Sequence, residues 1–358
     1  MKILSQSFNQ NPNVRNILRA VVVAVVIGLL VNLVIAFLLN AGTTLRSINR
    51  IQWTFVAIPF GCYLLIYLVD ALRLQLILSQ FRLRVPFRDL IDNGLLGAFF
   101  SNLTPFASGG QPFQVYHLHA LGIDLKKSTN IIASRWVEHL VTSLLVVALA
   151  FHAAINLAHS VGAGTIIIYL GFGVSLIFAI VVAGVLFRPD LLARIAQRIE
   201  RSPIGRLISR IARRQEWGEQ FVAWSLRLKE EVSFLWRQKL HIMLLDTLLG
   251  FGNLLLQVCS LVFVLQGMTG RELDILQILV TFVTVNLVAY FIPTPGGSGS
   301  IEGIYSLVFS GFTGQPDLTF VAIVVWRFAT YYLHVFLGLI FFVPVMKRVE
   351  ALTRAGGS

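Results

Sequence analysis

Two arginines lie inside apolar stretches of the sequence, where a charged side chain needs a partner or a purpose. Arg135 lies in the stretch 128–152, and Arg327 lies in the stretch 318–345. A charge deep in a membrane span costs at least ~2.5–3.5 kcal/mol. Because a planar guanidinium binds two oxygens of one phosphate at once, both arginines are candidate binding groups for an anion such as a lipid phosphate.

The neighbours of these arginines leave different alternatives open. Glu138 follows Arg135 by three residues, so an ion pair on one helix is the structural alternative to anion binding. No acidic residue lies within a turn of Arg327, and its nearest polar neighbour is Tyr331 at i+4. Arg327 is therefore the better candidate for holding an anionic headgroup.

Other ionisable residues in apolar stretches are weaker candidates. Glu302 has no adjacent base, so we expect it to be protonated, paired across the bundle, or functional. His139 and His334 are candidates for proton handling, with a buried structural histidine as the alternative. Three further charged residues are expected to be structural and shallow, reaching the membrane surface: Asp70, Arg73 and Asp246.

Two further apolar stretches, 87–121 and 275–312, are broken by Pro and Gly, and their halves are too short to cross a bilayer. We predict re-entrant hairpins whose breaks face each other or a cavity, because such backbone is tolerated at membrane depth only there. Freed N–H groups and helix N-termini would favour an anion, whereas turns that merely pack are the alternative. The break residues are Pro105, Gly109, Gly110, Pro293, Pro295, Gly296, Gly297 and Gly299. Polar candidates beside the first break are Asn102, Gln111, Gln114 and Tyr116.

Composition sets the fold class. Only 13% of the 358 residues are charged and the mean hydropathy is +0.78, whereas about 25% are charged in a soluble domain. Six apolar stretches reach the ~20 residues that a span needs: 18–40, 53–80, 128–152, 163–187, 240–266 and 318–345. We predict an all-α polytopic membrane protein with six full transmembrane helices and two broken re-entrant hairpins.

The basic residues predict the orientation. With the N- and C-termini in the cytoplasm, 23 of the 29 Lys and Arg residues fall in cytoplasmic segments, as the positive-inside rule requires. The net charge of +12 is thereby explained without nucleic acid. We expect a multi-pass protein of a bacterial-type inner membrane.

This topology divides the chain into two inverted repeats, 15–155 and 160–345, within one transmembrane domain spanning 1–358. Inverted repeats with broken helices are the architecture of alternating-access transporters. The segment 188–239 is basic and amphipathic, and we expect it to lie on the cytoplasmic leaflet, with a solvated linker as the alternative.

Motifs of enzymes and cofactor sites are not found in the sequence. It contains no Walker motif, no H-E-x-x-H and no C-x-x-C, and its two cysteines cannot form a disulfide framework. We expect no catalytic residues, no metal and no cofactor, so transport would run on a gradient or equilibrate its substrate.

The segments NLTPFASGGQPFQ (102–114) and PTPGGSGSIEG (293–303) resemble the flippase-like transmembrane family, the membrane portion of lysylphosphatidylglycerol synthases in its stand-alone form. The resemblance covers about residues 15–345. It implies movement of phospholipids, such as aminoacylated phosphatidylglycerol, between leaflets, with Arg135 at a position where the family tends to have arginine. The family's full-length synthases continue into an aminoacyl-transferase domain, which we do not expect after Lys347.

We therefore expect a lipid translocase for anionic, aminoacylated or glycosylated phospholipids. An accessory subunit for a separate lipid-modifying transferase is the alternative. An intramembrane enzyme lacks a visible nucleophile, and a transporter of soluble anions would share the architecture. Substrate identity, direction, coupling ion and oligomeric state stay open at this stage.

Overall fold

The computed structural model describes residues 51–104, 107–149, 237–289, 294–297 and 299–356, with isolated positions between 173 and 234. The predicted spans 18–40 and 163–187 and most of the basic segment 188–239 lie outside these residues. The described part is helical and contains no strand. Its elements are α3 (Thr54–Gln80), α4 (Phe87–Leu103), α5 (Gly110–Ala120), α6 (Leu125–Leu149), α12 (Leu240–Thr269), α13 (Ile275–Ala289), η4 (Pro295–Gly297), α14 (Ser300–Thr313), α15 (Pro316–Arg327), η5 (Phe328–Tyr332) and α16 (Leu333–Gly356).

Three described helical segments are long and apolar enough to cross a membrane: Thr54–Gln80, Leu240–Thr269 and Pro316–Ala351. They match three of the predicted spans, and the last continues six residues beyond its predicted end. The predicted span 128–152 corresponds to the helix α6, which begins three residues earlier and is not among these three segments.

The long helices present apolar side chains on their outer surface. Exposed leucine and phenylalanine side chains follow helical spacing, which leaves an apolar stripe on each helix. They include Leu64, Leu65, Leu68 and Leu72 on α3, Leu244, Leu245 and Leu248 on α12, and Phe336, Ile340 and Phe341 on α16. Contiguous exposed apolar surface of this kind favours contact with lipid.

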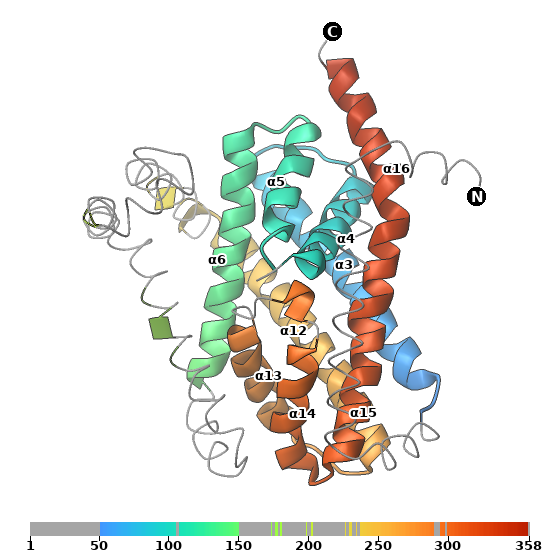
Figure 1. Ribbon diagram of the computed structural model, residues 1–358. Coiled ribbons are helices and arrows are strands. Elements are labelled where there is room, and N and C mark those ends of the chain that lie inside the picture. Colours follow the sequence, from blue (N-terminus) through green and yellow to red (C-terminus); the bar gives the residue numbers. More distant parts are fainter. Residues whose placement is uncertain are drawn as a thin grey trace, which may run out of the picture.

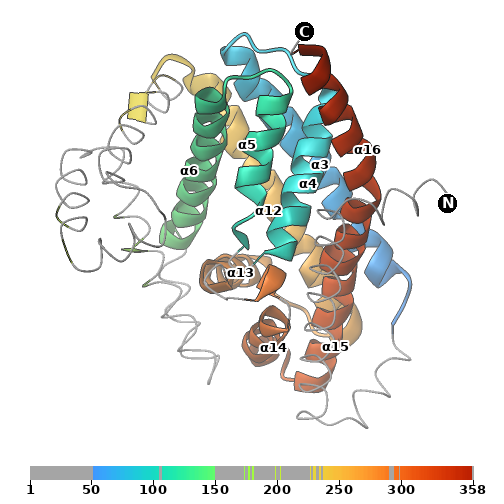
Figure 2. The same ribbon diagram turned by 45° about the horizontal axis from the view of Figure 1, so that its top comes forward.

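Two helical hairpins are packed between the long helices. The first consists of α4 and α5, which lie side by side in the upper half of Figure 1. The second consists of α13 and α14, which occupy the lower half. Turning the molecule in Figure 2 leaves this division unchanged, so the hairpins approach each other from opposite ends of the bundle.

Aromatic and β-branched side chains fill the interior beside the second hairpin. Tyr305 stacks on Trp326 with ring centroids 5.9 Å apart, and the indole N–H of Trp326 donates to Ser260 Oγ at 2.9 Å. This core joins α12, α13, α14 and α15 and fixes the helix that carries Arg327.

Candidate functional site

The breaks of the two hairpins meet in the middle of the fold. α4 ends at Leu103, and η4, from the second break, packs against it. The Tyr331 hydroxyl donates to the main-chain oxygen of Asn102 at 3.2 Å. A Cβ on Gly296 would lie 2.9 Å from that oxygen, so the two backbones are in close contact. The predicted proximity of the breaks is therefore observed, while their depth in a membrane stays a prediction.

Arg327 and Glu302 form a buried ion pair at this junction. Arg327 Nε donates to Glu302 Oε1 at 3.3 Å, and its Nη2 donates to the Gly296 main-chain oxygen at 3.0 Å. The guanidinium carbon also lies 4.2 Å from the centre of the Tyr331 ring. Arg327 is 8% exposed and Glu302 is fully buried. No acidic residue lies within a turn of Arg327 in the sequence, and its acidic partner, Glu302, comes from another helix, α14.

Glu302 also holds the second break together. Its other oxygen, Oε2, accepts the N–H of Gly299 at 2.7 Å, and Gly299 is the residue that precedes α14. One carboxylate thus satisfies a free backbone donor at a helix N-terminus and a guanidinium. Of the alternatives for Glu302, pairing across the bundle is the one observed.

A π-helical turn follows Arg327 directly. Residues Phe328–Tyr332 form this turn between α15 and α16, and Tyr331 belongs to it. π-turns occur frequently at functional sites, where one extra residue changes the direction of nearby side chains. Here the turn lets Tyr331 reach both Arg327 and Asn102 from the same helical rod.

We expect Gly296→Ala to destabilise the protein more than Gly314→Ala. Both glycines have positive φ, 57° and 66°, so alanine costs about 1–2 kcal/mol of backbone strain at either position. A Cβ at Gly296 would also lie 2.3 Å from the Tyr331 ring, whereas at Gly314 it meets nothing within 4 Å. Overpacking adds about 1–3 kcal/mol. Thermal unfolding in detergent measures the difference, and equal losses would contradict the close contact of the breaks.

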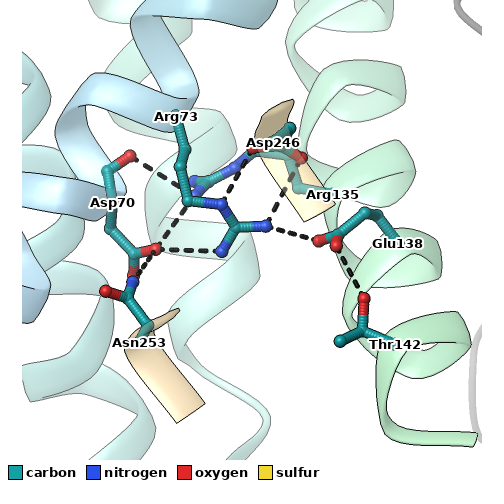
Figure 3. Close-up of polar contacts among 7 residues, drawn as sticks. All are labelled: Asp70, Arg73, Arg135, Glu138, Thr142, Asp246 and Asn253. Atoms are coloured by element: carbon teal, nitrogen blue, oxygen red, sulfur yellow. Dashed lines mark hydrogen bonds and ion pairs between the residues drawn. The ribbon is translucent and has the colours of Figure 1, made fainter. Parts of the chain in front are cut away.

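A second buried polar group, which we name the Arg73 cluster, joins α3, α6 and α12 (Figure 3). It consists of Asp70, Arg73, Arg135, Glu138, Thr142, Asp246 and Asn253. Arg73 Nε donates to Asp246 Oδ1 at 2.8 Å, and Arg73 Nη2 contacts Glu138 Oε2 at 2.5 Å. These three side chains are 0–6% exposed. Arg73 and Asp246 have the expected structural role, but they do not reach outward to the membrane surface, because their charges are paired inside the bundle.

Asp70 and Arg135 complete this cluster on its more exposed side. Asp70 Oδ1 accepts from Arg73 Nη1 at 3.3 Å, from Arg135 Nη2 at 3.4 Å and from Asn253 Nδ2 at 3.1 Å. The Asp70 side chain is 34% exposed. Arg135 thus pairs with Asp70 on α3, and the alternative in which Arg135 pairs with Glu138 on its own helix is wrong.

The remaining predicted residues divide between the junction and the surface. Gly109 donates its N–H to Thr104 Oγ1 at 2.8 Å within the first break, and Gly110 begins α5. Gln114 packs against Gly97 of α4, and Gln111 is partly buried. Tyr116 of α5 is 46% exposed, and its predicted place beside a cavity at the first break stays a prediction. Pro105 and Pro293 lie outside the described residues, and Pro295 and Gly297 are within η4.

The two histidines have different environments. His139 is exposed on α6. His334 is 2% exposed, and the rings of Phe60, Tyr63 and Tyr67 surround it with centroids 5.0–5.5 Å from its own. Neither of its ring nitrogens has a hydrogen-bond partner within the described part of the chain. His334 therefore packs as one ring of an aromatic cage, as expected for a buried structural histidine.

The interior location of Arg73, Asp246 and Asn253 was not predicted from the sequence. The signal was present for Arg73 and Asp246, because both lie in apolar stretches where an unpaired charge is costly. A third ion-pair group was also not predicted, in which Arg348 of α16 contacts Asp89 and Asp92 of α4. Among the described residues, no group of three or more His, Cys, Asp or Glu side chains is placed to hold a metal ion.

Comparison with known proteins identifies the family. The family model for the lysylphosphatidylglycerol synthase TM region matches residues 21–338. The chain belongs to this family. A relative in the same family, a UPF0104 membrane protein of Methanothermobacter thermautotrophicus, is 25% identical over 341 residues, covering 91% of this chain and 93% of that protein. No solved structure matches the chain.

The match to the lysylphosphatidylglycerol synthase TM region covers both hairpins and both buried ion-pair groups. Membership in a membrane family agrees with the apolar helices, so the chain is a multi-pass membrane protein. The resemblance that the two broken motifs indicated is thus confirmed at the level of the family.

Proposed function

We propose that this protein moves phospholipids between the leaflets of the membrane and is a transporter without an enzymatic activity of its own. The observation that carries the proposal is the junction of the two breaks, where Arg327 donates to the Gly296 oxygen of the second break and stacks on Tyr331, which donates to the Asn102 oxygen of the first. Two hairpins that approach from opposite ends provide one site with two possible routes of access. The family's description as the membrane region of a lipid synthase supports a phospholipid substrate.

In the described conformation the Arg327 site is closed. Its guanidinium already binds Glu302 and the Gly296 oxygen, and it stacks on Tyr331. A headgroup phosphate therefore has to take the place of Glu302 or of the Gly296 oxygen. This exchange keeps the arginine neutralised at every stage, and the apolar tails remain in contact with the exposed stripes of the long helices.

The proposal is tested with the full chain in vesicles of phosphatidylcholine and phosphatidylglycerol. A headgroup-labelled phosphatidylglycerol is quenched from outside, and the loss of the protected inner pool is followed with time. We expect faster exchange than in vesicles without protein, and little acceleration for a labelled neutral glycolipid without phosphate. Exchange at the rate of empty vesicles for every lipid would contradict the proposal.

The description of the family also favours a second candidate, an accessory subunit for a lipid-modifying transferase. This function predicts a stable complex with such an enzyme. Purification in mild detergent from a native membrane distinguishes the two. Retention of a transferase in fixed proportion, together with no lipid exchange by the isolated chain, would favour the accessory role.

A further inference from the structure

The Arg73 cluster contains more acidic than basic groups. Three carboxylates, Asp70, Glu138 and Asp246, face two guanidiniums, Arg73 and Arg135. No other charged side chain of the described residues forms an ion pair with them, and His139 on α6 is exposed. Because an uncompensated charge is costly in a buried site, one additional positive charge is needed to balance this cluster.

The geometry locates the unbalanced charge. Asp70 is partly exposed and is the only carboxylate that contacts Arg135. One guanidinium, that of Arg73, therefore faces two buried carboxylates, Glu138 and Asp246, which are 2% and 0% exposed. Water cannot screen either of these two groups, so the missing charge belongs with one of them.

Hydrogen-bond chemistry distinguishes Glu138 from Asp246. Asp246 contacts Arg73 through both oxygens, Oδ1 with Nε at 2.8 Å and Oδ2 with Nη2 at 3.4 Å. Because a guanidinium only donates, a proton on Asp246 would face another donor. Glu138 differs, because its Oε1 contacts the Thr142 hydroxyl at 2.8 Å and only Oε2 contacts Arg73. A hydroxyl can accept as well as donate, so a protonated Glu138 keeps both contacts.

We propose that Glu138 binds and releases a proton, and that this proton is coupled to lipid movement. The partly exposed carboxylate of Asp70 also contacts the Arg73 guanidinium. Asp70 therefore marks the polar side of the cluster, from which a proton reaches Glu138. The proton site rests on the geometry of the cluster alone. Its coupling to transport rests on the proposed lipid translocation.

Protonation of Glu138 weakens the attachment of α6 to α3. The Glu138 carboxylate and Arg135 are the two charged groups that tie α6 to α3. Adding a proton converts the Glu138–Arg73 ion pair into a hydrogen bond with a neutral partner, which is weaker. Because α5 packs against α6, the first hairpin is linked to this change. Proton binding can thus loosen the first hairpin in one state and fix it in the other.

Infrared difference titration of the full chain in detergent tests the proton site directly. We expect a carboxyl C=O band that appears as the pH falls, that is lost in Glu138→Gln, and that persists in Glu272→Gln. Glu272 is an exposed residue between α12 and α13, so it controls for the same chemical change. A band that is unchanged in Glu138→Gln, or absent from the wild type, would overturn the proposal.

Coupling is tested in vesicles with an imposed pH gradient. If one proton moves with each lipid, one pH unit shifts the steady-state ratio of labelled lipid between leaflets about tenfold. We expect this shift in the wild type and in Glu138→Asp, and a ratio near one in Glu138→Gln. An equal shift in Glu138→Gln, or a response to a sodium gradient instead, overturns the coupling. An infrared band without any lipid exchange supports the proton site and contradicts the transport function.

Discussion

Replacing Arg73 by methionine is expected to destabilise the protein by about 3–5 kcal/mol, the largest effect of any single substitution in the described bundle. The change leaves the carboxylate of Asp246, which is fully buried, without its guanidinium partner. It also removes the contact of Arg73 with Gly250 of α12, where a Cβ would lie 2.8 Å from Nη2. Thermal and denaturant-induced unfolding in detergent measure the loss.

Two further variants test whether the loss of stability comes from the buried charges. Arg73→Met/Glu138→Gln/Asp246→Asn removes both buried carboxylate charges together with their shared partner, and we expect it to recover most of the lost stability, because neutral replacements of buried ion pairs are tolerated. Arg271→Met changes an exposed arginine in the same way and is expected to have little effect. Equal losses in Arg73→Met and Arg271→Met would contradict the buried cluster.

Removing Arg327 is expected to have the second largest effect, and to affect both stability and transport. Arg327→Gln leaves Glu302, which is fully buried, without its cationic partner, at a cost of about 3–5 kcal/mol. If the guanidinium also binds phosphate, lipid exchange falls by about tenfold or more, which corresponds to about 1.4 kcal/mol or more. Unfolding and vesicle exchange are measured on the same preparations.

A double-mutant cycle separates the two roles of Arg327. Arg327→Gln/Glu302→Gln removes both charges, so we expect stability to return towards that of the wild type. Lipid exchange stays low if Arg327 binds phosphate, because the guanidinium is still missing. Full recovery of exchange in the double variant would show that Arg327 serves only to neutralise the buried carboxylate of Glu302.

The sequence was sufficient to predict three long apolar helices and the two breaks, but not the partners of the charged groups. Runs of apolar residues predict α3 and α12 because the thickness of the membrane sets the length of a span. Pro and Gly predict the breaks around Gly110 and Gly296 because these residues interrupt a helix. Both predictions use neighbouring residues only.

The ion pairs depend on which helix faces meet, and a single sequence does not contain that information. Arg73 and Asp246 are 173 residues apart, and Glu302 and Arg327 are 25 residues apart. The cost of burying a charge implies that each arginine has a partner, but several carboxylates in apolar stretches satisfy that requirement equally well. The alternative in which Arg135 pairs with nearby Glu138 is not observed, because Arg135 pairs with Asp70 of α3.

The π-turn at Phe328–Tyr332 changes how the second half of the last long helix is rotated about the helix axis relative to the first half. In an uninterrupted α-helix each residue adds about 100° of rotation, so the face presented by one half dictates the face presented by the other. The surplus residue of the π-turn shifts the face of the second half by a fixed rotation relative to the first. The half ending at Arg327 can present its guanidinium to Glu302 while the half beginning at Leu333 presents its own side chains to α4. A single continuous helix thereby contacts both hairpins, each through a different face.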